Sequence, residues 1–198
     1  MEHVDPACPR LVLASASPRR RALLAQLGIA CRVQAACVDE TAHPGESAGA
    51  HALRLAGDKA RAVGEDGSMG LPVLAADTVV EVDGRLLHKP ADRAAGLAML
   101  ALLSGRIHRV HTGVCLLAGG RLRSRLSVST VWFRRLSADE MRAYWDTGEP
   151  RDKAGGYAVQ GRGAAFIRRL EGSYSGVMGL PLYETAELLR EAGIELFA

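Results

Sequence analysis

The chain has 198 residues, of which 48% are apolar and 24% are charged, and its formal net charge is +3 at pH 7. This composition fits one globular domain, or two small lobes that share a core, and the modest charge with few aromatics argues against a nucleic-acid-binding surface. No apolar run is long enough to cross a bilayer and no signal-peptide pattern is present, so we expect a cytoplasmic protein that is not bound to a membrane.

The cysteines form neither a metal-binding nor a disulfide pattern. They include no C-x-x-C pair, and no histidine lies at the spacing of a zinc finger. We therefore expect free thiols at all four positions, which are Cys8, Cys31, Cys37 and Cys115.

The first predicted unit is a strand, a tight turn and a helix. Residues 11–15 form a short apolar run that is typical of a buried strand. Ser17 is a candidate N-cap, Pro18 is suited to the first helical position, and Gly28 ends the helix.

The rest of the chain alternates between strand and helix patterns. Those patterns predict strands over 30–38, 71–82, 86–87, 107–117 and 122–133, and helices over 46–63, 92–103, 137–146 and 182–192. The glycine-rich segment 148–181 has little periodicity and is either flexible or a set of binding loops held by a scaffold; its short apolar pieces favour binding loops. We expect a single α/β unit with a mixed, twisted sheet and flanking helices, bent into two lobes around a cleft.

Three consecutive arginines begin the first predicted helix, where cations oppose the helix dipole. With the hydroxyls of Ser15 and Ser17, the residues Arg19, Arg20 and Arg21 would form an anion cradle in which a bound phosphate offsets their repulsion. The alternative is a solvated basic helix start at which Ser17 is only a cap. The Walker pattern is absent, so this turn is not a P-loop.

Lysine is rare here, because only three of the 25 basic residues are lysines. Lys59, Lys89 and Lys153 each lie in a polar or turn-forming stretch. A compact ammonium reaches a single phosphate oxygen in a tight site better than a planar guanidinium does. Either a phosphate-binding site requires lysine at these three positions, or lysine occurs there by chance.

Two carboxylates are candidates for catalysis or metal binding. Asp77 lies in the middle of the most apolar predicted strand, where an unpaired carboxylate is expensive to bury. It would activate water or hold a divalent cation, unless it forms a structural ion pair. Glu40, in a predicted loop, is a second candidate, although loop glutamates are usually only solvated.

These groups together suit phosphoryl chemistry on a triphosphate, for which catalysis is mainly positioning and charge neutralisation. The segment 148–181 adds Tyr157 and Gln160, and a glutamine amide both donates and accepts hydrogen bonds, as reading of a base edge requires. No serine or cysteine nucleophile motif is present.

Several separated motifs now make a family recognisable. Between about residues 11 and 190, the chain resembles the Maf family of nucleoside triphosphate pyrophosphatases, in the motifs Ser15-Ala16-Ser17-Pro18-Arg19-Arg20, Ala76-Asp77-Thr78-Val79-Val80, Lys89-Pro90, Ser104-Gly105 and residues 152–161. The resemblance implies a fold like that of the inosine triphosphate pyrophosphatases. It also implies hydrolysis of nucleoside triphosphates to monophosphate and diphosphate with Mg²⁺ or Mn²⁺, in a homodimer.

The resemblance also assigns roles to residues. Asp77 matches the proton acceptor, and Glu40, Lys59 and Lys89 match the polar catalytic site, with Glu40 and Asp77 as candidate metal ligands. The positions that match substrate-binding or substrate-choice residues are Ser15, Ser17, Arg19, Arg20, Thr78, Lys153 and Gln160. The S-P-R-R form, together with glutamine at position 160, resembles the branch that acts on dTTP and UTP.

Two positions depart from the family pattern, Ala76 and His88, and residues 1–10 match nothing. Neither departure removes a charged site residue. A rival function is a nucleotide-binding regulator, since members of the family are linked to septum formation; it would need the arginines and Gln160 but no pair of carboxylates. A sugar-phosphate enzyme is a second rival, and it would show no preference among bases.

Overall fold

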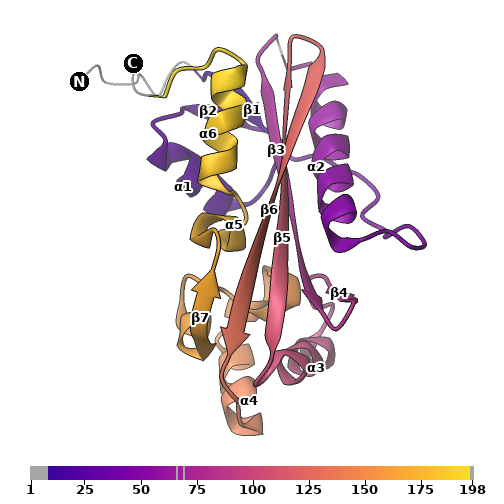
Figure 1. Ribbon diagram of the computed structural model, residues 1–198, viewed down its shortest axis with the longest axis vertical. Coiled ribbons are helices and arrows are strands. Elements are labelled where there is room, and N and C mark those ends of the chain that lie inside the picture. Colours follow the sequence, from indigo (N-terminus) through magenta and orange to yellow (C-terminus); the bar gives the residue numbers. More distant parts are fainter. Residues whose placement is uncertain (1–8, 66, 69, 197–198) are drawn as a thin grey trace.

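The computed structural model describes residues 9–65, 67–68 and 70–196. These residues form an α/β fold in which one long sheet carries helices on both faces (Figure 1). The elements are β1 (Leu11–Leu13), α1 (Pro18–Gln26), β2 (Cys31–Val33), α2 (Ala48–Glu65), β3 (Val73–Val82), β4 (Arg85–Leu87), α3 (Arg93–Leu103), β5 (Ile107–Ala118), β6 (Arg121–Phe133), α4 (Ala138–Asp146), β7 (Ile167–Glu171), α5 (Tyr174–Met178) and α6 (Leu182–Glu191).

The sheet is mixed, as the sequence predicts. Its strand order is β2-β1-β3-β5-β6-β7, and β4 pairs with β3 outside this path. The short strands β1 and β2 are parallel to each other and β1 is parallel to β3, whereas β3, β5, β6 and β7 pair in antiparallel fashion. The long β5–β6 hairpin runs the length of the molecule and joins its two ends (Figure 1).

One edge of β3 is interrupted. Along its other edge, β3 pairs continuously with β5. On the interrupted edge, β1 pairs only with Val73 and Leu74, and β4 pairs only with the end of the strand from Val80 onward. Among the described residues, no strand covers positions 75–79 on that edge. The backbone edge of β3 therefore lacks a strand partner at this point.

Two hydrophobic cores lie on either side of that gap. Leu74 and Ala76 of β3 belong to a core with β1, α1 and α6, while Val80 and Val82 belong to another with α3 and α4. A single strand thus contributes to both cores, and Asp77 and Thr78 lie at their junction. The predicted arrangement of two lobes around a cleft is confirmed.

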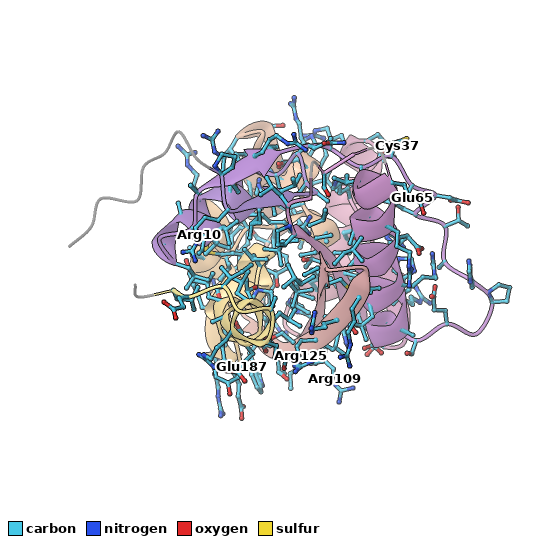
Figure 2. All side chains as sticks on the ribbon, turned by 90° about the horizontal axis from the view of Figure 1, so that it is seen from above. Arg10, Cys37, Glu65, Arg109, Arg125 and Glu187 are labelled. Carbon is cyan, nitrogen blue, oxygen red and sulfur yellow. The ribbon has the colours of Figure 1, made fainter. Side chains whose placement is uncertain are left out.

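Helix α2 covers the opposite face of the sheet from α1 and α6, and charged side chains such as Glu65 and Arg109 point away from the body (Figure 2). Its close approach depends on Gly113, which pairs with Asp77 across β3 and β5. A Cβ atom at Gly113 would lie 2.5 Å from the backbone oxygen of Ala52 in α2. Gly113 therefore sets the distance between α2 and the strand that carries Asp77.

We predict that Gly113→Ala destabilises the protein by about 1–3 kcal/mol, because the backbone of α2 must move away from the sheet. Gly57→Ala, inside α2, is the matched control. Its new methyl group would meet only flexible side-chain atoms of Arg61 and Leu122 at 3.4 Å, so helix propensity should leave stability unchanged or raise it by up to about 1 kcal/mol. Denaturant unfolding measures both, and equal effects would contradict this role of Gly113.

Two predicted boundaries are wrong for identifiable reasons. The strand predicted over 30–38 is limited to β2, because its partner β1 has only three residues with which it can pair. The helix predicted from Glu46 begins at Ala48. Ser47 acts as its cap by accepting the N–H of Ala50 at 3.3 Å, while the Glu46 carboxylate contacts His51 and Arg54 instead.

The segment 148–181 contains more regular structure than its sequence predicts. It forms three 3-10 turns, Glu149–Asp152, Ala154–Gly156 and Arg162–Phe166, followed by β7 and α5.

Cys31, Cys37 and Cys115 are free, as expected, whereas Cys8 lies outside the described residues. Within the described ranges, no helix has both the length and the apolar character that crossing a bilayer requires.

Candidate functional site

A cavity of about 630 Å³ lies at the gap in the edge of β3. Its lining comes from the turn between β1 and α1, the loop after β2, helix α2, strand β3, the loop after β4 and the segment 148–181. All eleven residues predicted for the site line it: Ser15, Ser17, Arg19, Arg20, Glu40, Lys59, Asp77, Thr78, Lys89, Lys153 and Gln160. Residues from across the chain therefore meet in one place.

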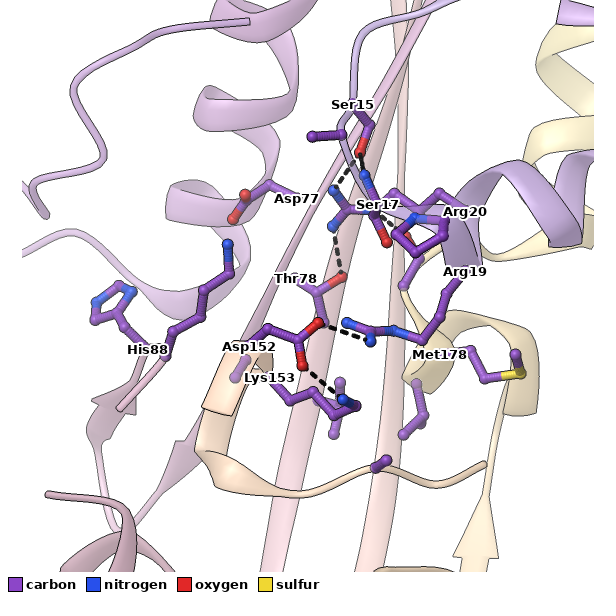
Figure 3. A pocket seen from close by; sticks show the side chains of 18 of the residues that line it. Ser15, Ser17, Arg19, Arg20, Asp77, Thr78, His88, Asp152, Lys153 and Met178 are labelled. Carbon is purple, nitrogen blue, oxygen red and sulfur yellow. Dashed lines mark hydrogen bonds and ion pairs between the residues drawn. The ribbon is translucent and has the colours of Figure 1, made fainter. Parts of the chain in front are cut away.

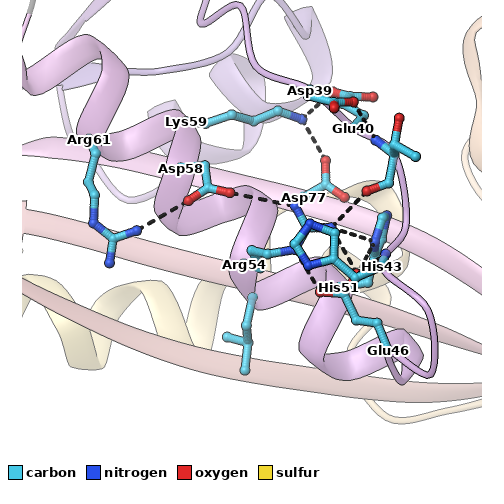
Figure 4. A network of polar contacts seen from close by, with 12 residues as sticks. Asp39, Glu40, His43, Glu46, His51, Arg54, Asp58, Lys59, Arg61 and Asp77 are labelled. Atoms are coloured by element: carbon cyan, nitrogen blue, oxygen red, sulfur yellow. Dashed lines mark hydrogen bonds and ion pairs between the residues drawn. The ribbon is translucent and has the colours of Figure 1, made fainter.

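The acidic part of the cavity is centred on Lys59 (Figure 4). Its ammonium lies 2.6 Å from Asp77 Oδ1 and 2.6 Å from Glu40 Oε1. Asp77 and Lys59 are each only 9% exposed, whereas the Glu40 side chain is half exposed. The ion pair that the sequence analysis considered as an alternative for Asp77 is therefore present, with Lys59 as its partner, and both residues line the cavity.

The electrostatics of this cluster favour the charged form of Glu40. Burial would raise the pKa of Glu40, but the hydrogen bond and charge of Lys59, helped by Lys89 and Arg20, outweigh it and lower that pKa. Glu40 therefore remains an anion at neutral pH, despite lying beside a buried carboxylate.

The cationic part of the cavity is organised by Arg20 (Figure 3). Its guanidinium donates to Gly179 O at 2.7 Å and to the hydroxyl oxygens of Ser15 and Thr78, both at 3.3 Å. These partners come from three separate parts of the chain. Burial lowers the pKa of Arg20, whereas the charge of Asp77 opposes this shift.

Of the three consecutive arginines, Arg19 and Arg20 line the cavity, while the exposed Arg21 does not. Ser17 occupies the N-cap position of α1, but its side chain makes no capping hydrogen bond, so that detail of the prediction is wrong. The hydroxyl of Ser15 instead accepts the N–H of Ser17 at 3.2 Å and shapes the turn. Ser17 therefore lines the cavity, and its hydroxyl does not cap the helix.

Lys153, in the segment 148–181, adds a second cationic group, and Asp152 connects it to Arg19. Asp152 Oδ2 accepts a hydrogen bond from Arg19 at 3.1 Å, and its Oδ1 accepts one from Lys153 at 2.6 Å (Figure 3). Burial would raise the pKa of Asp152, but its hydrogen bond to Lys153 and the charge of Arg19 lower it. The Arg19–Asp152 pair links α1 to the segment 148–181 within the lining of the cavity.

The sequence analysis assigned no role to two polar lining residues, Asp152 and His88, and placed Tyr157 only among the polar groups of the segment 148–181. Asp152 lies within a recognised motif, so its position next to Lys153 was a usable signal. The Tyr157 hydroxyl is 2.8 Å from Nε2 of His108, and burial lowers the pKa of His108 to about 4, which keeps the imidazole neutral. No local pattern connects these two residues in the sequence.

The cavity offers few ligands for a divalent cation. The described part of the chain contains no cluster of three or more histidine, cysteine or acidic residues that could hold a metal by themselves. Glu40 and Asp77 are nonetheless brought together by one ammonium, and Mg²⁺ in phosphate-binding sites is commonly held by one or two carboxylates plus substrate oxygens. The two residues therefore fit a cation that is completed by phosphate, but not a closed protein cage.

Comparison with known proteins agrees with this geometry. Residues 10–192 match the family described as Maf-like protein. A Bordetella avium protein named dTTP/UTP pyrophosphatase is 53% identical, over 96% of this chain and 98% of its own length. Proteins of the same name from Alkalilimnicola ehrlichii and Aromatoleum aromaticum are 53% and 49% identical over 94% and 98% of this chain, and over 95% and 100% of their own lengths. The chain therefore belongs to the Maf family.

Proposed function

We propose that this protein is a hydrolase that cleaves dTTP and UTP between the α and β phosphates, and that it acts as a single domain. The observation that carries the proposal is the paired carboxylates on Lys59, which share one cavity with Arg20, Lys89 and Lys153. Relatives named dTTP/UTP pyrophosphatase, similar along nearly their whole length, support the same substrates. The family resemblance alone supports the remaining parts of the proposal, a homodimer in the cytoplasm.

In the proposed reaction, a water molecule attacks the α phosphorus and the bond to the bridging oxygen of the diphosphate breaks. Asp77 accepts the proton of that water, and Lys59 holds its carboxylate in place through Oδ1. Negative charge builds up on the departing diphosphate, which Arg20, Lys89 and Lys153 would neutralise.

We propose that Glu40 and Asp77 bind Mg²⁺ or Mn²⁺ together with phosphate oxygens. Such a cation supplies charge neutralisation at the phosphates and increases the acidity of bound water. Both carboxylates have a second oxygen beyond the one that contacts Lys59, which supports this assignment.

Base recognition is proposed for residues on both sides of the cavity. Arg19 belongs to α1, Thr78 to the middle of β3 and Gln160 to the segment 148–181, so a nucleoside between them would contact all three parts of the cavity wall. The hydroxyl of Thr78 is oriented by Thr112 at 3.0 Å, in addition to Arg20. The amide of Gln160 has the donor and acceptor that an edge of uracil or thymine requires.

Diphosphate release from a panel of nucleotides tests the proposal. We expect turnover of dTTP and UTP with Mg²⁺ or Mn²⁺, little turnover of 7-methyl-GTP, and a decrease of about 100-fold or more when the metal is removed with a chelator. Restored activity after adding the metal back is the control for damage by the chelator. Nucleotide binding without diphosphate release would instead indicate the regulator, and equal turnover of all bases would remove the proposed specificity.

A further inference from the structure

The loop that carries Gln160 is fixed at both ends by one carboxylate and one phenol. The carboxylate of Glu149 accepts the backbone N–H of Arg162 and that of Gly163, each at 3.0 Å. The hydroxyl of Tyr144 donates to Glu149 at 2.8 Å and accepts the backbone N–H of Ala158 at 3.0 Å. The two side chains thus hold the backbone on both sides of residue 160.

The loop also wraps closely around this carboxylate. Gly161 has a φ of 136°, which side-chain-bearing residues rarely adopt, and a Cβ atom there would lie 2.6 Å from Glu149 Oε2. The residue immediately after Gln160 is therefore pressed against Glu149. A shift of the carboxylate would move the peptide that carries the glutamine side chain.

Tyr144 and Glu149, which hold this loop, are themselves held in place by packing and hydrogen bonds. Tyr144 belongs to α4, is only 4% exposed and packs edge-to-face against Phe166 with ring centroids 4.8 Å apart. Burial raises the pKa of Tyr144, so its hydroxyl stays protonated and can donate. Burial would also raise the pKa of Glu149, but the backbone N–H groups of Gly163 and Arg162, with Tyr144, outweigh it and lower that pKa.

Neither Tyr144 nor Glu149 lines the cavity, whereas Gln160, between the two points that they hold, is exposed within its wall. Because a side chain on a loop discriminates between ligands only if its backbone is held in place, this support has a functional consequence. We propose that Tyr144 and Glu149 are positioning residues that fix Gln160 against the nucleobase and so determine base recognition. The inference rests on the proposed binding of dTTP and UTP.

The test compares a ligand with a base to one without. Dissociation constants for UTP and for inorganic triphosphate are measured by calorimetry with chelator present, so that no turnover is needed. In Glu149→Gln the amide N–H₂ would face backbone N–H donors, and in Tyr144→Phe the N–H of Ala158 loses its partner. Each variant should weaken UTP binding by about tenfold, while inorganic triphosphate binding changes by less than about twofold.

Two further variants separate positioning from general damage. In a Gln160→Ala background, Glu149→Gln should weaken UTP binding no further, because the residue through which it acts has been removed. Glu140→Gln is the matched control: this carboxylate, in α4, accepts the N–H of the N-cap residue Ser137 and pairs with Arg134, away from the cavity. Its dissociation constants for both ligands should equal those of the wild type.

Three results would overturn the inference: unchanged UTP binding in both Glu149→Gln and Tyr144→Phe, an equal loss for inorganic triphosphate, or a full additional loss in the Gln160→Ala background. Wild-type protein that binds UTP no better than inorganic triphosphate would also overturn it. A protein that binds UTP with the predicted pattern but releases no diphosphate would contradict the proposed hydrolysis and support the positioning role of Tyr144 and Glu149.

Discussion

Asparagine in place of Asp77 is expected to lower the rate of diphosphate release from UTP by about 10³-fold, with KM changed by only a few-fold. A carboxylate that accepts a proton from the attacking water contributes about 10²–10⁴ to the rate, and an amide cannot do so. The substitution keeps the shape of the side chain and an oxygen that accepts from Lys59. The melting temperature should therefore change by only a few degrees.

Asp58→Asn is the matched control for Asp77→Asn. Asp58 is also a carboxylate near Lys59 in the sequence, but it pairs with Arg54 and Arg61 on the outside of α2. Its turnover should remain close to that of the wild type. If Asp77→Asn retained near-normal turnover while its fold was intact, Asp77 would not be the proton acceptor.

Lys59→Met is expected to produce the largest loss of stability, about 3 kcal/mol at pH 7. The ammonium of Lys59 is the only group that contacts both Asp77 and Glu40 among the described ion pairs, and removing one partner of a buried pair typically costs about 3–5 kcal/mol. Because Glu40 is half exposed, the lower end of that range applies. The melting temperature should fall by about 6–12 °C, measured by calorimetry or circular dichroism.

The stability difference between wild type and Lys59→Met should depend on pH. In the wild type the pKa of Glu40 is below its usual value, so its stabilising contribution is present above that usual value and is lost as pH falls through the folded one. In the variant this lowering is absent, so Glu40 takes up a proton at a higher pH than in the wild type, which relieves its repulsion with Asp77. The difference in unfolding free energy should therefore be full at pH 7 and shrink as pH falls below 4.5, the usual pKa of a glutamate.

Arg61→Met serves as the control for that pH series. Arg61 lies half a turn from Lys59 on α2, is more than half exposed and pairs only with Asp58 among the described residues. Its replacement should change stability by less than about 0.5 kcal/mol at every pH, as expected for an exposed ion pair. A pH-independent deficit in Lys59→Met would show that the lost packing of its stem, and not the two carboxylates, dominates the effect.

The long elements were predictable because their signals are local. The predicted strands over 107–117 and 122–133 correspond to β5 and β6 within one residue at each end, and the capping box of Ser137 and Glu140 is present at the start of α4. Periodicity and end caps specify such elements without reference to distant residues. Short strands are different, because β2 ends where its partner β1 ends.

The distinction between local signals and contacts with distant residues also applies to the site. Asp77, Lys59 and Arg20 were identifiable because a charge in an apolar strand, a rare lysine and a cationic helix start each violate a local expectation. Glu149 and Tyr144 violate none, since a glutamate after glycine and a tyrosine in a helix are ordinary. Their importance follows only from hydrogen bonds to residues 158–163, which no pattern in the chain reveals.

The sequence by itself determined the fold class, the family and eleven of the polar residues that meet in the cavity. Only the tertiary structure decided that Asp77 and Thr78, which point to opposite faces of β3, serve the same cavity. The physical reason is that β1 and β4 are too short to cover the middle of the β3 edge, and strand pairing of this kind depends on residues far apart in the chain.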